Sequence, residues 1–389
     1  MVLAAATLAV VSGCKPKNSF RVRVVNQDSK PLAGAKLLVG FDWPFTGTTN
    51  DNGLVYVPNA YDGDTATIAR TNFRSERAGI SPDAQVVMTP MPESLQLVGA
   101  VEGSAVLFGP GTLTTITGDG RYHVYTYSDT RVTEVKSLQL PQPVRHQCVH
   151  GDTLWYATYD SGLYAFSLSN RLKPVKLMHV DIEGVLDPFT ILDTFIVMSN
   201  VLSGGPLRIF SYRPDGSTGL VSAFDSPSAG QVAIVSHYVV AVGSLHDMPL
   251  IYDIADIQNP REVYHGIQPR YWSGFVRDYR VIMNGYDSVS GRDTSCYGVV
   301  DLTDPAHPAQ TGPFPTDSWL NDILDDSVAV GDYNLLGISI LRGSITGEFH
   351  SVALVQAEPD FHGYALQGSF PPYFILYGQL WKLVSPNVR

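Results

Sequence analysis

Three residues of the kinds that bind transition metals stand close together in one short stretch: His146, Cys148 and His150. They occupy alternate positions of a predicted β-strand, so their side chains point to the same face. Imidazole and thiolate are ligands that zinc and copper prefer. A straight strand, however, separates the first of them from the last by about 13 Å, which is too far for one ion to join them. The pattern therefore favours a packed cysteine with partly exposed histidines, and the sequence indicates no metal and no cofactor.

A larger set of polar and aromatic residues falls at the starts of strands that we predict to be innermost in a series of repeated units. This rim set consists of His146, Asp187, Gln231, Trp272, Trp319, Asn321 and His362. Aromatic faces stack on sugars or pack against apolar side chains, while neighbouring polar groups fix the orientation of a ligand, so the set suits a glycan or a peptide. The alternative is structural, because strand starts are hydrated and both tryptophans would then pack between units.

The rim set also allows an enzymatic function. His146, Asp187 and His362 are residue types that hydrolases and lyases use for acid–base chemistry. The sequence lacks better-defined catalytic motifs, since it has no G-x-S-x-G nucleophile elbow and no D-x-D-x-D-G calcium loop. A binding protein is therefore the favoured interpretation, and a hydrolase or lyase using these three residues is the alternative.

The composition limits the kinds of partner. The chain has 389 residues, of which 44% are hydrophobic and 16% charged, with 35 glycines and 26 prolines. Such a composition is typical of a globular all-β protein with many tight turns. The net charge is −11 and lysines and arginines form no extended run. A nucleic acid is therefore not expected as a partner.

The elements that position the rim set follow from a repeat. Residues 94–389 contain seven similar units about 40 residues apart, each with about four strand-length apolar runs. One unit shows the template, with an inner strand, two middle strands and an outer strand over 145–151, 153–160, 162–169 and 174–180. This period and strand content predict a seven-bladed β-propeller. The last unit lacks an outer strand, and residues 94–101 would supply it, so that pairing of the two ends closes the ring.

Two of the units share a turn sequence, YDIADIQNP at 252–260 and VDLTDPAHP at 300–308. Both resemble the LVIVD-repeat proteins, a bacterial propeller group whose repeats combine an apolar strand, a D-[IVL]-[ST]-[DN]-P turn and a second proline. The other units match this pattern in part or have lost the proline. The resemblance implies the propeller fold and no particular activity.

Residues 20–92 have a different pattern. An alternating strand begins at Phe20, and turns at 28–31 and 51–53 predict hairpins. The stretches PLAGA at 31–35 and TNDNG at 49–53 resemble carboxypeptidase-regulatory-like (transthyretin-like) domains, which are small β-sandwiches. The resemblance implies a spacer or adhesion module. Asp51 is interpreted as a turn residue, because no second carboxylate stands beside it at calcium-loop spacing.

The first residues, MVLAAATLAVVSGC, form an apolar run that ends in small residues and Cys14. This run resembles a bacterial lipoprotein signal, although no basic residue precedes it. The resemblance implies that residues 1–13 are a signal peptide, that Cys14 carries the lipid and that residues 14–19 are a tether. Lys15 after the cysteine implies the outer membrane, on its periplasmic or surface side. The alternatives are a buried strand or a transmembrane helix, for which the run is short.

The sequence thus predicts an all-β, lipid-anchored protein of the cell envelope, in which a β-sandwich precedes a propeller. Its expected partners are the membrane, through the anchor, and a protein or a glycan at the propeller rim.

Overall fold

The computed structural model describes residues 18–39, 45–60, 64–159, 162–182, 188–200, 205–224, 229–243, 249–266, 271–277, 279–287, 294–316, 318–325, 327–332, 337–356, 366–370 and 372–384. Every regular element in these residues is a β-strand. Within the same residues, no helix offers the length and hydrophobicity that a membrane crossing requires. The chain divides into two compact units, Met1–Met91 and Pro92–Arg389.

The first unit contains two sheets. In strand order they are β4 (Leu54–Ala60), β1 (Asn18–Asn26) and β7 (Ala84–Met88), and β3 (Phe45–Thr48), β2 (Lys36–Val39), β5 (Thr65–Arg70) and β6 (Phe73–Gly79). Strand β1 pairs antiparallel with β4 and parallel with β7. Side chains from both sheets, among them Val22, Val24, Leu37 and Ile68, form one cluster of buried apolar residues. The two sheets therefore share a core, and the strands alternate between this core and the outer surface.

Both turns predicted in the first unit are present. The first closes a short antiparallel bridge between Val25 and Pro31, but neither turn joins two strands of the same sheet. The turn after β1 leads to β2, and the turn at Asn50–Gly53 leads from β3 to β4, so each carries the chain from one sheet to the other. Gly53 has φ +69°, and a Cβ there would lie 2.3 Å from the backbone oxygen of Val24. The predicted turns are confirmed, but the strands that follow them join the opposite sheet, because a turn sequence fixes the local reversal but not the sheet that the next strand joins.

The second unit holds, in its described residues, seven sheets of four strands each. Sheets one to three are β9 (Ser104–Gly109), β10 (Thr112–Ile116), β11 (Arg121–Tyr127) and β12 (Val132–Gln139); β13 (His146–His150), β14 (Thr153–Ala157), β15 (Leu163–Ser167) and β16 (Val175–Val180); and β17 (Phe189–Leu192), β18 (Phe195–Asn200), β19 (Gly205–Tyr212) and β20 (Thr218–Phe224). Sheets four and five are β21 (Ala229–Val235), β22 (Tyr238–Gly243), β23 (Leu250–Asp253) and β24 (Arg261–His265); and β25 (Tyr271–Arg277), β26 (Arg280–Asp287), β27 (Thr294–Asp301) and β28 (Ala309–Pro315). Sheets six and seven are β29 (Trp319–Asp325), β30 (Val328–Asp332), β31 (Gly337–Gly343) and β32 (Phe349–Gln356); and β33 (Leu366–Phe370), β34 (Tyr373–Leu376), β35 (Gln379–Val384) and β8 (Ser94–Ala100).

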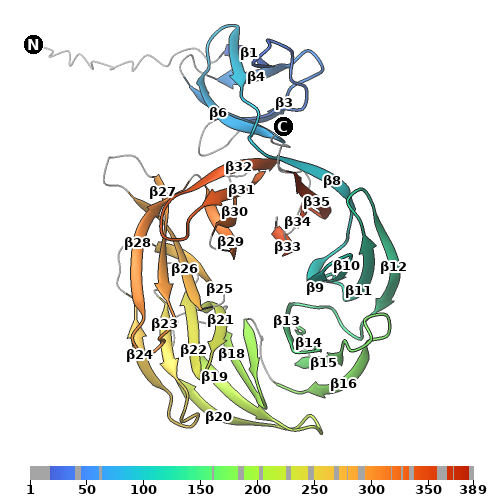
Figure 1. The fold of residues 1–389 in the computed structure, drawn as a ribbon, viewed down its shortest axis with the longest axis vertical. Helices are drawn as coiled ribbons and strands as arrows, with labels where there is room; N and C mark the ends of the chain where they lie inside the picture. Colours follow the sequence, from blue (N-terminus) through green and yellow to red (C-terminus); the bar gives the residue numbers. More distant parts are fainter. Residues whose placement is uncertain are drawn as a thin grey trace, which may run out of the picture. The chain divides into compact units, whose positions relative to one another are not determined.

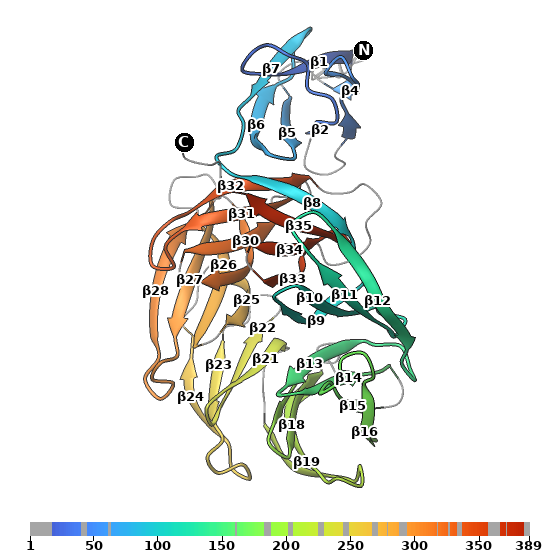
Figure 2. The same ribbon diagram turned by 45° about the vertical axis from the view of Figure 1, so that its right-hand side comes forward.

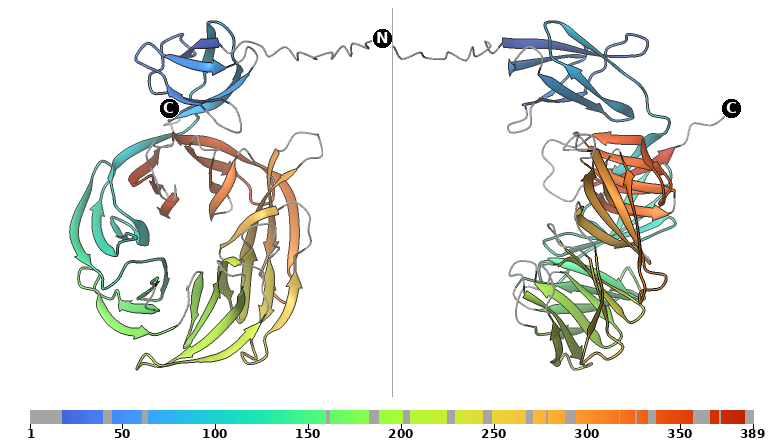
Figure 3. Two further views of the ribbon diagram at one scale, coloured as in Figure 1. Left: turned by 180° about the vertical axis from the view of Figure 1, so that it is seen from behind. Right: turned by 90° about the vertical axis from the view of Figure 1, so that its left-hand side faces the viewer.

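These sheets have the strand order of propeller blades. In Figure 1 they follow one another around a centre, with the first strand of each innermost, and the opposite view shows the same arrangement (Figure 3, left). First strands of successive sheets contact each other from β9 through β13, β17, β21 and β25 to β29, and β33 contacts β9. The buried apolar clusters join adjacent sheets, as in the cluster that combines Trp155 of sheet two with Phe189 of sheet three. The all-β class and the blade-like sheets agree with the prediction.

The recurring turn between third and fourth strands is held by aspartate side chains. In sheet four, Asp253 and Asp256 each accept a hydrogen bond from the backbone N–H two residues later, at 2.9 and 3.1 Å. In sheet five, Asp301 and Asp304 do the same at 2.8 and 3.2 Å. Such turns depend only on neighbouring residues. The turn sequence therefore persists in two units whose other residues differ.

The strand β8 pairs antiparallel with β35 as the outermost strand of sheet seven, although almost 300 residues separate the two in the chain. The two strands lie alongside each other in Figure 2. Leu95 packs in the cluster of sheets six and seven, and Val98 in the cluster of sheets seven and one. A single strand at the start of the second unit thus contributes to the packing of three sheets.

Candidate functional site

The described members of the rim set lie on innermost strands, but they are spread over separate sheets. His146 belongs to sheet two, Gln231 to sheet four, and Trp319 and Asn321 to sheet six. Sheet three lies between sheets two and four, and sheet five lies between sheets four and six. Strand β25 includes Trp272, but nothing is described of its side chain, and Asp187, His362 and Cys14 lie outside the described residues. The combination of His146, Asp187 and His362 therefore stays a prediction.

His146 contributes to packing between sheets. Its ring is half-buried and meets the ring of Phe189 edge-on, with centroids 5.3 Å apart and an interplanar angle of 76°. Phe189 begins the innermost strand of sheet three and is only 1% exposed. Aromatic pairs prefer this edge-to-face arrangement. The contact gives His146 a structural role between two neighbouring sheets.

Gln231 also connects neighbouring sheets. Its Oε1 atom accepts a hydrogen bond of 2.6 Å from the backbone N–H of Val276 in β25. This contact satisfies a backbone donor of sheet five through a side chain of sheet four. Because the carbonyl of Gln231 is engaged, it is less suited to binding a ligand than the sequence suggested.

The rim residues best placed for contact with a partner lie at the start of β29. Trp319 is half-buried and Asn321 is exposed, while Leu320 between them is buried. The ladder between β29 and β30 shifts register between Leu320 and Asp322, so Asn321 lies in a β-bulge. Bulges redirect side chains and are common beside functional sites. The Trp319–Asp322 segment is therefore the candidate functional site.

A buried asparagine fixes this segment. Asn284 of β26 donates a hydrogen bond of 2.7 Å to the carbonyl oxygen of Leu320 and accepts one of 2.9 Å from its N–H. The side chain is 1% exposed. Because both backbone groups of Leu320 are held, the positions of Trp319 and Asn321 on either side are also restricted. Asn284 was not among the residues predicted from the sequence, where its signal is an amide at the end of the apolar run RVIMN.

An ion pair links the segment to sheet five. Arg277 Nη1 lies 3.9 Å from Asp322 Oδ2, and the arginine side chain is 45% exposed. The site thus combines an aromatic ring, an amide and a charged pair on neighbouring innermost strands. Such groups bind peptides or sugars through packing and hydrogen bonds.

The H-x-C-x-H strand does not have the properties of a metal site. Cys148 packs against the cluster of sheets two and three, whereas His150 is exposed. Burial raises the pKa of the Cys148 thiol to about 12. A protonated thiol is a poor metal ligand and a poor nucleophile at neutral pH. Among the described residues, no group of histidine, cysteine and acidic side chains is arranged to hold a metal ion.

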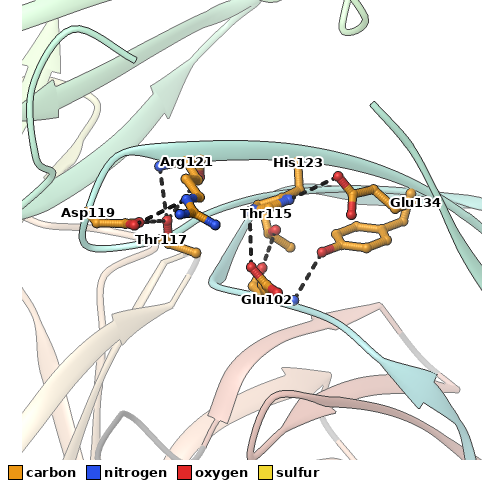
Figure 4. A network of polar contacts seen from close by, with 8 residues as sticks. Glu102, Thr115, Thr117, Asp119, Arg121, His123 and Glu134 are labelled. Atoms are coloured by element: carbon orange, nitrogen blue, oxygen red, sulfur yellow. Dashed lines mark hydrogen bonds and ion pairs between the residues drawn. The ribbon is translucent and has the colours of Figure 1, made fainter. Parts of the chain in front are cut away.

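A second polar cluster, not predicted from the sequence, surrounds His123 on β11 (Figure 4). The imidazole side chain is 4% exposed, with Nδ1 3.3 Å from Glu134 Oε1 and Nε2 3.5 Å from Glu102 Oε2. Glu102 belongs to the connection between β8 and β9, and Glu134 to the outer strand β12. The histidine therefore links this connection to the outer edge of sheet one.

The same connection is held through its backbone. Tyr125 OH accepts a hydrogen bond of 3.1 Å from Glu102 N–H, and Thr115 donates one to Glu102 C=O. Burial raises the pKa of Tyr125. At the other end of β11, Asp119 accepts a hydrogen bond from Thr117, which lowers its pKa, and lies 3.3 Å from Arg121 Nε. The contacts of Glu102 fix the connection that leads from β8 into sheet one, so we assign the cluster a positioning role.

No protein-family model matches the chain, and no curated protein matches it in sequence. Several solved structures are similar in shape. The Pan2 WD40 domain of Neurospora crassa has 10% identity and a TM-score of 0.48, covering 77% of this chain and 97% of that one. The WD40 β-propeller domain of Doa1 has 13% identity and a TM-score of 0.46, covering 76% and 98%. Sqt1 of Saccharomyces cerevisiae has 9% identity and a TM-score of 0.45, covering 76% and 98%. Similarity at this level assigns no activity and no partner.

Proposed function

We propose that the chain is a binding protein whose second unit is a seven-bladed β-propeller that holds a protein partner at the Trp319–Asp322 segment. The observation that carries the proposal is the Asn284 clamp, which fixes an exposed amide and a half-buried indole on an innermost strand. Pre-ordering a contact surface lowers the entropy lost on binding. The bulge at Asn321 adds support, since it turns that side chain away from the regular ladder.

We infer further that pairing of β8 with β35 closes the propeller. Contacts between successive innermost strands and between β33 and β9 support a ring. Closure leaves no open sheet edge between the first and last blades, which protects a β-protein from edge-to-edge association. The resemblance of two turns to LVIVD repeats is consistent with this arrangement.

We also propose that the protein is anchored in the outer membrane of a bacterial envelope through a lipid on Cys14. The proposal rests on the VSGC sequence at 11–14 and on Lys15 after it. The first unit would then be a β-sandwich spacer of the carboxypeptidase-regulatory-like kind, between the tether at 14–19 and the propeller. The shared core of its two sheets supports a module with its own packing.

Site-specific photo-cross-linking in whole cells tests the binding surface. A photoreactive benzoyl-phenylalanine at position 321 should give a discrete adduct, and the same probe at the exposed Lys136 of the outer strand β12 should give none. Adding Asn284→Ala to the position 321 variant should weaken the adduct, because the segment loses its clamp. Absence of an adduct at 321, or equal adducts at both positions, would exclude this surface.

A further inference from the structure

The first unit contains a groove lined only by its own residues. It has a volume of about 310 Å³ and is lined by Arg21, Arg23, Asn52, Leu54, Asp83 and Gln85. These residues come from β1 and from the strands on both sides of it, β4 and β7, including the turns that precede them (Figure 2). A volume of this size is at the lower end for small-molecule sites. The groove therefore suits a small ring better than an extended surface.

The strand register explains why these side chains meet. Arg23 is paired with Leu54 on one side and with Gln85 on the other, and Arg21 is paired with Tyr56. Directly paired residues point to the same face of a sheet. Because Val22 and Val24 face the core, Arg21 and Arg23 face outwards.

The two arginines are in different electrostatic states. Arg21 pairs with Asp83, whose φ of 57° holds it in the turn immediately before β7. Arg23 is exposed and makes no ion pair within the part of the chain that the structure describes. A guanidinium without a carboxylate partner is a ready site for a planar anion, which it binds with two parallel hydrogen bonds. The groove thus offers one unmatched positive charge in a chain of net charge −11.

The other polar groups in the groove accept hydrogen bonds, and some of them can also donate. Asp83 supplies carboxylate oxygens, and Asn52 and Gln85 supply amides that both donate and accept. Beside the groove, Tyr56 is 62% exposed on the same face. An exposed aromatic ring next to polar groups is a platform for the apolar face of a sugar.

We propose that this groove binds a carboxylate-bearing sugar, such as a uronic acid residue of an acidic glycan. Arg23 binds the carboxylate, the ring lies against Tyr56, and the hydroxyl groups donate to Asp83 and to the amides. A phosphate fits less well, because it brings more negative charge toward Asp83 and has few protons to donate to the acceptors. A membrane surface fits less well because the site is concave. The proposal goes beyond the propeller function and does not depend on it.

Calorimetric titration of the purified full-length chain with oligomers of galacturonic and mannuronic acid tests the proposal. We expect saturable binding of at least one oligomer, and at least about tenfold weaker binding by Arg23→Gln, because the variant loses the charge-assisted hydrogen bonds to the carboxylate. Tyr56→Ala should also weaken binding. Arg74→Gln is the matched control, because Arg74 is an exposed arginine on β6 of the other sheet. Unchanged thermal midpoints would show that the variants fold.

Two further ligands separate the alternatives. The methyl ester of the oligogalacturonate has the same rings without the charge, and we expect it to bind at least tenfold more weakly. Equal binding of acid and ester, or no binding of either acid, would overturn the proposal. Vesicles containing phosphatidylglycerol form the last arm, and Arg23-dependent binding to vesicles without glycan binding would show a membrane-binding face instead.

Discussion

The strand β8 provides a direct test of how the second unit holds together. Leu95 on this strand is 3% exposed and packs with Phe374 and Val330 in the cluster of sheets six and seven. Replacing it with alanine removes three buried carbons and leaves a cavity, at a cost of about 2–5 kcal/mol in the free energy of unfolding. Leu97 on the same strand is 48% exposed, so Leu97→Ala should cost about 1 kcal/mol or less.

Chemical unfolding followed by tryptophan fluorescence measures this difference. All tryptophans except Trp43 belong to the second unit, so the signal reports mainly on its sheets. We expect Leu95→Ala to lower the denaturant concentration at the unfolding midpoint clearly and Leu97→Ala to leave it nearly unchanged. Equal midpoints for the two variants would refute the reasoning, because the strand would then contribute its backbone pairing but not its buried side chain.

Three further outcomes are expected, two from the structure and one from the proposed lipid anchor. Asn284→Ala should lower the free energy of unfolding by about 1–3 kcal/mol, since it leaves two buried backbone groups of Leu320 unsatisfied. In the same fluorescence assay, Asn321→Ala at the exposed bulge should change the free energy of unfolding by less than about 0.5 kcal/mol. The pKa of the Cys148 thiol is raised to about 12, so this thiol should resist alkylation in the native protein at pH 8 and react faster only as the pH approaches 12. It should react readily after unfolding, and rapid labelling of the native protein at pH 8 would contradict its burial. The proposed anchor predicts a lipid on Cys14 in the membrane fraction of the wild-type protein and its loss in Cys14→Ser, both measured by mass spectrometry. A wild-type chain that lacks the modification would rule out the anchor.

Local sequence determined much of the secondary structure of this protein. Alternating apolar residues predicted the strands, and the spacing of the polar turns predicted their grouping in fours. The aspartate turns of sheets four and five illustrate why: each is closed by a side chain and an N–H only two residues apart. Interactions of such short range are encoded directly in the sequence.

Only the tertiary structure decided what two of the rim residues and the neighbouring Asn284 do. His146 meets Phe189, Gln231 binds the N–H of Val276, and Asn284 holds Leu320. In each case the partner lies on the next sheet, about 40 residues away in the chain. Whether a polar side chain at a strand start faces a ligand or a neighbouring sheet depends on how adjacent sheets are placed.

The first unit shows the same limit. Its turns were recognisable, but whether the next strand joins the same sheet or the opposite one follows from burial of the shared core. The Glu102–His123–Glu134 cluster likewise forms only when the connection after β8 lies against β11 and β12. Hydrophobic packing of distant segments sets these positions, and no periodicity within a single strand records it.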